Sequence, residues 1–296
     1  MRTQKIFEDV PGFGGTAYRE TQFESILDHC EQLRMFLADR GLRFRRDNAL
    51  AKILRNAEAV ISSRLAGKVH AEAGEILNLL YANRIAESIL TAKLDEGAWD
   101  CVRRIAGNQL GPLDRVRSMG KDALWELELA NRLKRLGAKV QHADPPDLIV
   151  EGSDFSYGLA CKKIYSEKGV EAQVRKGVQQ LKKSGRHGLV AISLDELVPR
   201  DSILGGPNQQ GAVKFLSDFN KKFLERHMRK VGRFIIDERC DGLLVSTSVF
   251  SDIKSAENRW SNHTQSMLWS VQDVSPDITR RLASFAQILN VEGIRP

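Results

Sequence analysis

The chain has few cysteines and no long apolar run, and both absences exclude classes of protein. Its four cysteines lie far apart and form no closely spaced pair, which argues against a disulfide framework and a zinc ribbon; they are Cys30, Cys101, Cys161 and Cys240. No apolar stretch approaches the roughly 20 residues that a membrane-spanning helix needs, and none follows the basic residues at positions 1–5. We therefore expect a cytoplasmic protein without a membrane partner, whose cysteines are buried free thiols.

Several short motifs are also missing. The six histidines include no His-x-x-x-His pair, which argues against a histidine-based zinc site. No Gly-x-Ser-x-Gly sequence is present to indicate a serine hydrolase. The glycine-rich segment 12–15 follows no predicted strand and precedes no Gly-Lys-Ser/Thr, so it lacks the setting of a phosphate-binding loop.

The composition is that of a basic globular protein. Of its 296 residues, 42% are hydrophobic and 28% charged, which leaves little room for long disordered segments. This length exceeds one average domain, so we expect two. The net charge of +7 favours a polyanionic partner by long-range attraction, although charge alone is weak evidence.

The spacing of apolar residues divides the chain into two parts. Up to about Ile105 they recur at helical spacing, and turn-forming residues between 107 and 120 then interrupt the pattern. Beyond this break, short apolar runs alternate with helical patterns: helices are expected at 121–136, 170–183, 211–229 and 276–289, and strands at 138–142, 147–151, 157–165, 188–194 and 242–248. We predict an all-α region over residues 1–118 and an α/β domain over residues 119–296.

Three segments of the second part carry charged residues in an informative order: LWELELA (124–130), PPDLIV (145–150) and YGLACKK (157–163). In the first, Glu126 lies within about 20° of the centre of the apolar helix face, whereas Glu128 points the opposite way and is expected in solvent. A carboxylate on a buried face is costly unless it meets a cation, a metal ion or a hydrogen-bond donor. Glu126 is therefore a candidate functional residue, with a rim position that reaches solvent as the alternative.

The other two segments place an acid and a lysine at strand positions. Asp147 opens a strand directly after two prolines, where it suits a hard metal ion, although a capping Asp in a turn is equally plausible. In the third segment, alternation puts Ala160 and Lys162 on one face and Cys161 and Lys163 on the other. Lys162 is then expected to point toward Glu126 and Asp147.

In this order, the segments resemble the core of the PD-(D/E)xK nuclease superfamily, in which a Glu-bearing helix precedes a Pro-Asp strand and a strand that ends in acidic-x-Lys. The resemblance implies a restriction-endonuclease-like domain with a central mixed β-sheet flanked by helices. It implies an endonuclease that uses Mg²⁺ or Mn²⁺ and acts on DNA rather than RNA, with a possible role in bacterial defence against phage. The roles that it implies are metal binding by Asp147, position 160 and the carbonyl group of Cys161, activation of water by Lys162, binding of a second ion or its waters by Glu126, and placement of Gln180 near the scissile phosphate.

The sequence departs from the family at Ala160, where the pattern has Asp or Glu. The remaining carboxylates supply little negative charge, so we expect weak metal binding and severely reduced cleavage. The intact remainder of the motif favours an engineered Glu-to-Ala inactivation over a naturally degenerate domain. A non-catalytic nucleic-acid- or protein-binding module with a nuclease fold is the rival interpretation.

Basic residues around the third segment are expected to hold a phosphodiester backbone, as such groups do without reading sequence. They are Lys163, Lys168, Arg175, Lys176 and Lys183. A solvated polar helix face is the alternative for each of them. The helical region 1–118 is expected to serve oligomerisation, docking of a partner subunit or nucleic-acid docking.

Overall fold

The computed structural model describes residues 19–20, 23–45, 47–65, 73–112, 114–152, 154–199, 203–254, 260–272 and 274–289. The glycine-rich segment 12–15 lies outside these residues. None of the helices in the described ranges is both long and apolar enough to cross a membrane.

Helices dominate the N-terminal part, as the apolar spacing predicts. They are α1 (Phe23–Asp39), α2 (Ala49–Leu65), α3 (Ala73–Thr91), the short 3-10 helix η1 (Glu96–Ala98) and α4 (Trp99–Gly107). The part is not wholly helical, because β1 (Arg19–Glu20) pairs with a C-terminal strand of the main sheet.

A mixed sheet forms the rest of the fold, which is α+β overall. Its strands are β2 (Lys139–His142), β3 (Leu148–Glu151), β4 (Ser156–Lys163), β5 (Gly188–Ser193), β6 (Leu204–Gly206), β7 (Gly242–Ile253) and β8 (Trp260–Trp269). The order is β1-β8-β7-β5-β4-β3-β2, and β6 lies beside β7. The pairs β2–β3, β3–β4 and β7–β8 are antiparallel, whereas β4, β5 and β7 run parallel.

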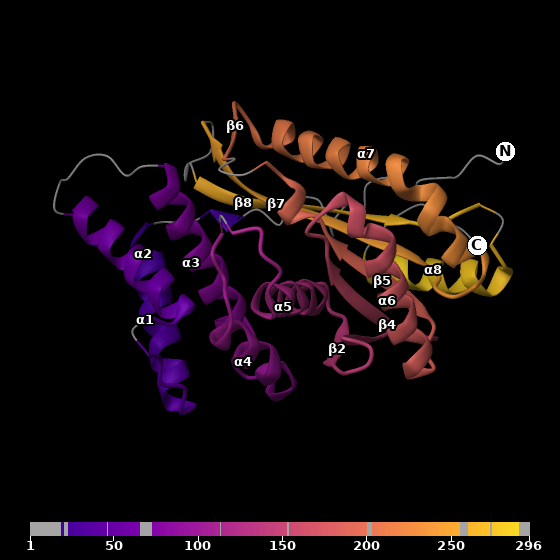
Figure 1. Ribbon diagram of the computed structural model, residues 1–296, viewed down its shortest axis with the longest axis horizontal. Helices are drawn as coiled ribbons and strands as arrows, with labels where there is room; N and C mark the ends of the chain where they lie inside the picture. The colour runs from indigo at the N-terminus through magenta and orange to yellow at the C-terminus, as the bar shows by residue number, and fades with distance from the viewer. Residues whose placement is uncertain are drawn as a thin grey trace.

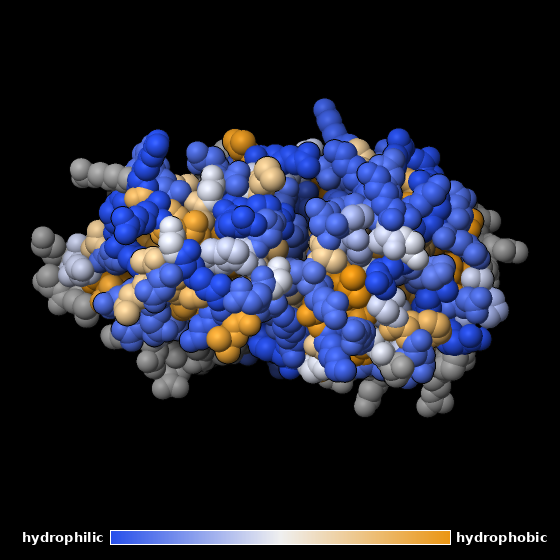
Figure 2. Space-filling view, turned by 90° about the horizontal axis from the view of Figure 1, so that it is seen from below, coloured by the Kyte–Doolittle hydropathy of each residue, from blue (hydrophilic) through white to orange (hydrophobic). Residues whose placement is uncertain are grey.

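Helices cover both faces of the sheet (Figure 1). On one face, α5 (Met119–Arg135) and α8 (Pro276–Ile288) share an apolar core with Leu159 and Cys161 of β4. On the other face, α6 (Val170–Ser184) and α7 (Gln209–Ile236) pack against Ala160 and neighbouring strand residues. The alternation predicted for β4 is therefore confirmed. Figure 2 shows that one side of the molecule is mainly hydrophilic, with apolar residues in small separate groups.

Helix α5 also belongs to the core of the N-terminal part. One apolar cluster contains residues of the four helices α1, α2, α3 and α4 together with Ala123, Leu124 and Leu127 of α5. Ser118 caps this helix, since its hydroxyl oxygen accepts a hydrogen bond from the backbone N–H of Gly120. Helix α5, which begins directly after residue 118, therefore packs into the apolar cores of both parts of the chain.

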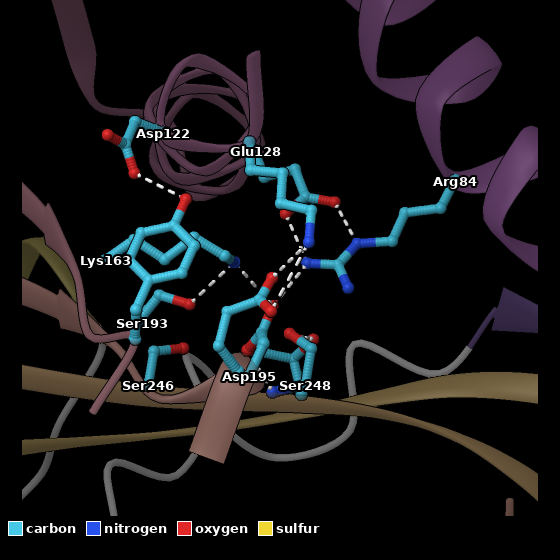
Figure 3. Close-up of polar contacts among 12 residues, drawn as sticks. Arg84, Asp122, Glu128, Lys163, Ser193, Asp195, Ser246 and Ser248 are labelled. Atoms are coloured by element: carbon cyan, nitrogen blue, oxygen red, sulfur yellow. Dashed lines mark hydrogen bonds and ion pairs between the residues drawn. The ribbon is translucent and has the colours of Figure 1, made fainter. Parts of the chain in front are cut away.

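A network of buried charges strengthens this junction (Figure 3). The guanidinium group of Arg84 in α3 lies 2.5 Å from a carboxylate oxygen of Glu128 in α5 and 2.8 Å from Asp195 in η3 (Asp195–Leu197). Glu128 was expected in solvent, and that prediction is wrong because α3 covers this side of α5. Lys163 lies 3.3 Å from Asp195. Burial alone would raise the pKa of Asp195, but the charges of Lys163 and Arg84 hold it well below its ordinary value.

Candidate functional site

The predicted site residues meet where β4 extends beyond its neighbour β3. The β3–β4 pairing reaches Leu148 and Leu159, whereas β4 continues to Lys163. Asp147 directly precedes β3, and its Oδ2 atom accepts a hydrogen bond of 2.6 Å from the backbone N–H of Cys161. Asp147 thus bonds to the edge of β4 that β3 leaves unpaired, because it lies directly before the first residue of β3.

Two further donors hold the carboxylate of Asp147. The ammonium group of Lys162 lies 3.2 Å from Oδ2, and the side-chain amide of Gln180 donates to Oδ1 at 3.1 Å. Lys162 also donates to the carbonyl oxygen of Cys161 at 2.6 Å. Both oxygens of Asp147 therefore already have hydrogen-bond donors from the protein.

Glu126 is buried in α5, with an exposed fraction of 6%, as its position on the apolar helix face predicts. Arg104 of α4 donates two hydrogen bonds to the carboxylate of Glu126, from Nη2 to Oε2 at 2.5 Å and from Nη1 to Oε1 at 3.1 Å. The thiol of Cys101 lies 3.4 Å from the same carboxylate. Burial raises the pKa of Glu126 above its ordinary value, opposed by the hydrogen bonds from Arg104 and reinforced by the negative charge of Asp147.

A cavity of about 420 Å³ opens between α5 and α6 beside these residues. Six basic and two acidic side chains line it, together with glutamines of α6. The basic ones are Arg104, Arg117, Lys162, Lys163, Lys176 and Lys183, and the acidic ones are Asp122 and Glu126. This excess of positive charge makes the cavity attractive to anions.

A divalent cation fits this arrangement poorly. Mg²⁺ prefers several oxygen ligands, usually carboxylates and waters. Here Asp147 accepts hydrogen bonds from three donors, and Arg104 pairs with Glu126. The third carboxylate, that of Asp122, accepts from the hydroxyl group of Tyr165, and the surrounding positive charge repels cations. The side-chain oxygen Oε1 of Gln180 is buried and accepts no hydrogen bond from the protein. A single amide oxygen does not offset the positive charge.

Ala160 lies in a packed layer and is not among the residues that line the cavity. Its side chain is fully buried beneath α6, at the point where Gly177 brings the helix close to the sheet. A Cβ atom at Gly177 would lie 2.7 Å from Val190 and 3.4 Å from the Cβ of Ala160. Small residues at both positions therefore permit the close packing of α6 on β4. The adjacent Cys161 lines the cavity instead, and burial raises the pKa of its thiol well above the ordinary value.

The five basic residues proposed to hold phosphate occupy different places. Lys176 and Lys183 line the cavity. Lys163 also lines it, but its ammonium group is buried and bonds to Ser193 and Asp195. Arg175 pairs with Glu171 on the outer side of α6, and Lys168 is exposed in η2 (Glu167–Gly169). These last two residues are not part of the cavity lining.

Two basic residues of the cavity lining, Arg104 and Arg117, were not predicted from the sequence. Arg104 belongs to the helical part, and its partner Glu126 lies 22 positions further along the chain. Neither residue belongs to a motif, so no local signal marked them. Comparisons with protein-family models, curated proteins and solved structures find no match for this chain.

Proposed function

We propose that this chain binds the phosphodiester backbone of DNA in the cavity between α5 and α6. We further propose that it does so on a nuclease framework of the PD-(D/E)xK type whose hydrolytic activity is severely impaired in this sequence. The excess of basic over acidic side chains around the cavity is the observation that carries the proposal.

The arrangement of four side chains supports the nuclease framework. Glu126 comes from a helix, Asp147 directly precedes β3, Lys162 lies on the neighbouring strand β4, and Gln180 comes from the following helix. Three of them meet directly, because Lys162 and Gln180 both bond to Asp147. This order of elements is the one that the resemblance implies for a nuclease core.

The cavity residues have distinct tasks in holding a phosphodiester. Lys176 and Lys183 of α6 can contact phosphate oxygens from one wall, and Arg117 from another. Lys162 has three N–H groups, of which two are used by Asp147 and Cys161, so one remains for a phosphate oxygen. The free Oε1 of Gln180 can accept from a water or a sugar hydroxyl.

A metal-dependent endonuclease that acts in defence against foreign DNA is the second candidate function. The convergence of Lys162 and Gln180 on Asp147 favours it. A bound Mg²⁺ or Mn²⁺ would supply an activated water in such an enzyme. Because Glu126 and Asp147 are both held by cations and other donors, this arrangement supports no hydrolytic step.

The proposal is tested by titrating a fluorescently labelled DNA duplex with the protein. With three to four phosphate contacts, the logarithm of the affinity is expected to fall with that of the salt concentration at a slope of about −3. The affinity should then drop roughly 60-fold between about 50 and 200 mM salt. Absence of binding at low salt would overturn the proposal. Rapid cleavage of plasmid DNA with Mg²⁺ or Mn²⁺ would instead favour the second candidate.

A further inference from the structure

The cavity between α5 and α6 is small compared with a DNA duplex. Its volume of about 420 Å³ lies toward the lower end of the range, about 300–1,000 Å³, in which proteins hold single small ligands. The major groove of B-DNA alone is about 12 Å wide, so a duplex cannot enter this space. A phosphate inside a strand is joined to two nucleosides, whereas a terminal phosphate is joined to one. A strand end therefore reaches the interior of the cavity more easily than the middle of a strand does.

The cavity lining offers contacts to phosphate but none to stacked bases. Of the described residues that line it, none is aromatic, and all except Met119 and Cys161 carry a charge or a side-chain amide. Proteins that hold the middle of a single strand stack its bases on aromatic side chains. Amide, ammonium and guanidinium groups instead donate hydrogen bonds to phosphate oxygens. The lining therefore fits a phosphate group rather than an unstacked base.

Half of the six basic side chains around the cavity already have an acidic partner, in the pairs Arg104–Glu126, Lys162–Asp147 and Lys163–Asp195. The other three, Arg117, Lys176 and Lys183, are exposed and form no ion pair with the described residues. The one remaining acid of the lining is Asp122, so three cations face one carboxylate and leave an excess of two positive charges. A phosphodiester group carries one negative charge, whereas a terminal phosphate carries about 1.5 to 2 at neutral pH. This excess favours the terminal phosphate.

Lys162 lies on the inner wall of the cavity, between the two exposed lysines of α6. Its side chain is 13% exposed, and its ammonium group lies 3.2 Å from Asp147, to which Gln180 also donates. Lys176 lies four residues before Gln180 and Lys183 three residues after it, so the two lysines flank Gln180 on one helix face. Two of the three N–H groups of Lys162 are used within the protein, and the third is left for a phosphate oxygen.

We propose that the cavity binds the phosphorylated end of a DNA strand, with the terminal phosphate beside Lys162 and the next phosphate beside Lys176 or Lys183. This inference rests on the proposed function, since it specifies which part of the DNA enters the cavity. The 5′-phosphate and the 3′-phosphate are chemically the same group. The direction in which the strand leaves the cavity decides between them.

The test is a competition experiment on the full chain, in which unlabelled DNA strands displace a strand with an internal fluorophore. The four competitors have one sequence and carry a 5′-phosphate, a 3′-phosphate, hydroxyl groups at both ends, or no ends because the strand is circular. At least one phosphorylated strand is expected to bind about tenfold more tightly than the hydroxyl-ended strand, because the added charge strengthens its hydrogen bonds. The circle should bind no better than the hydroxyl-ended strand.

Lys162→Gln is expected to lose most of this tenfold gain. Lys182→Gln is the matched control and should keep it, because Lys182 is exposed on α6 and is not part of the cavity lining. The comparison of the four strands needs no variant, so it decides the matter even if Lys162→Gln fails to fold. A gain that persists in folded Lys162→Gln would overturn the proposed position of the terminal phosphate.

A gain for the 5′-phosphate or for the 3′-phosphate would support the inference and identify the end that is bound. Equal affinities of the phosphorylated, hydroxyl-ended and circular strands would overturn it, but would leave DNA binding in the cavity in place. Absence of binding by all four strands would overturn both this inference and the proposed function.

Discussion

Reversing the charge of both Lys176 and Lys183 is expected to weaken DNA binding by at least about 100-fold, if each lost phosphate contact contributes about 1.4 kcal/mol. Both lysines line the cavity from α6, whereas Asp195 pairs with Arg84 and Lys163. The slope of the logarithm of affinity against the logarithm of salt concentration should also become shallower by about 1.8, because two phosphate contacts are removed. Fluorescence anisotropy with Lys176→Glu/Lys183→Glu measures both effects.

The matched control changes the same amount of charge on another surface. Lys222 and Lys230 are exposed on α7 and are not part of the cavity lining. Lys222→Glu/Lys230→Glu should reduce the affinity only through long-range attraction, and should leave most of the salt slope in place. Equal losses in the two double variants would mean that DNA is held by overall charge and not by the cavity.

Replacing Arg84 by methionine is expected to destabilise the protein by about 3–5 kcal/mol, the usual effect of breaking a buried ion pair. The substitution keeps an apolar side chain of similar length but leaves Glu128 and Asp195 without their shared cation. The midpoint of thermal unfolding should fall by roughly 10 °C. Arg34→Met is the control, since the Arg34–Glu58 pair is partly exposed and its loss should cost less than about 1 kcal/mol.

The same network makes a pH-dependent contribution to stability. The pKa of Asp195 is lowered in the folded protein, so the unfolded chain takes up a proton first as the pH falls. The ionised carboxylate of Asp195 stabilises the fold fully above about pH 3.9, the pKa of an aspartate in the unfolded chain. This stabilisation is lost as the pH falls from there through the lower pKa of the folded state. Urea unfolding at neutral and acid pH should show this loss in the parent and a smaller one in Asp195→Asn. Equal acid sensitivity in the two proteins would contradict the assigned role of Asp195.

Local patterns in the sequence predict the helices and strands that frame the site. The apolar face of α5 correctly places Glu126 in the interior, and strand alternation correctly separates Ala160 from Cys161. The convergence of Asp147, Lys162 and Gln180 also follows the predicted order of elements. These features depend on residues that are close in sequence or that share a regular period.

Strand β8 could not be predicted in this way, because its buried side chains are mostly polar. Ser266 and Thr264 bond across to serines of β7 at 2.8 Å, and Ser261 does the same. Such pairs satisfy polar groups inside the sheet, so the strand shows no apolar alternation. Its sequence therefore resembles a loop.

Contacts between the helical part and the sheet were likewise beyond the reach of sequence patterns. Arg104 and Arg84 look like ordinary helix-surface cations, and their roles arise only because α4 and α3 pack on α5. The place of Ala160 depends in the same way on Gly177, which lies on another element. Long-range packing decides which charges of this chain are structural and which face the cavity.

Protection of an introduced cysteine by DNA is the most direct measurement of where the phosphodiester lies. Gln179 is an exposed cavity residue, and the four native cysteines are buried, so maleimide labelling of Gln179→Cys reports on the cavity itself. With free DNA at about ten times its Kd, labelling should slow roughly tenfold, while Lys222→Cys on α7 is labelled at its usual rate. Unchanged labelling at position 179, with protection at position 222, would place the nucleic acid elsewhere and contradict a phosphate-binding cavity.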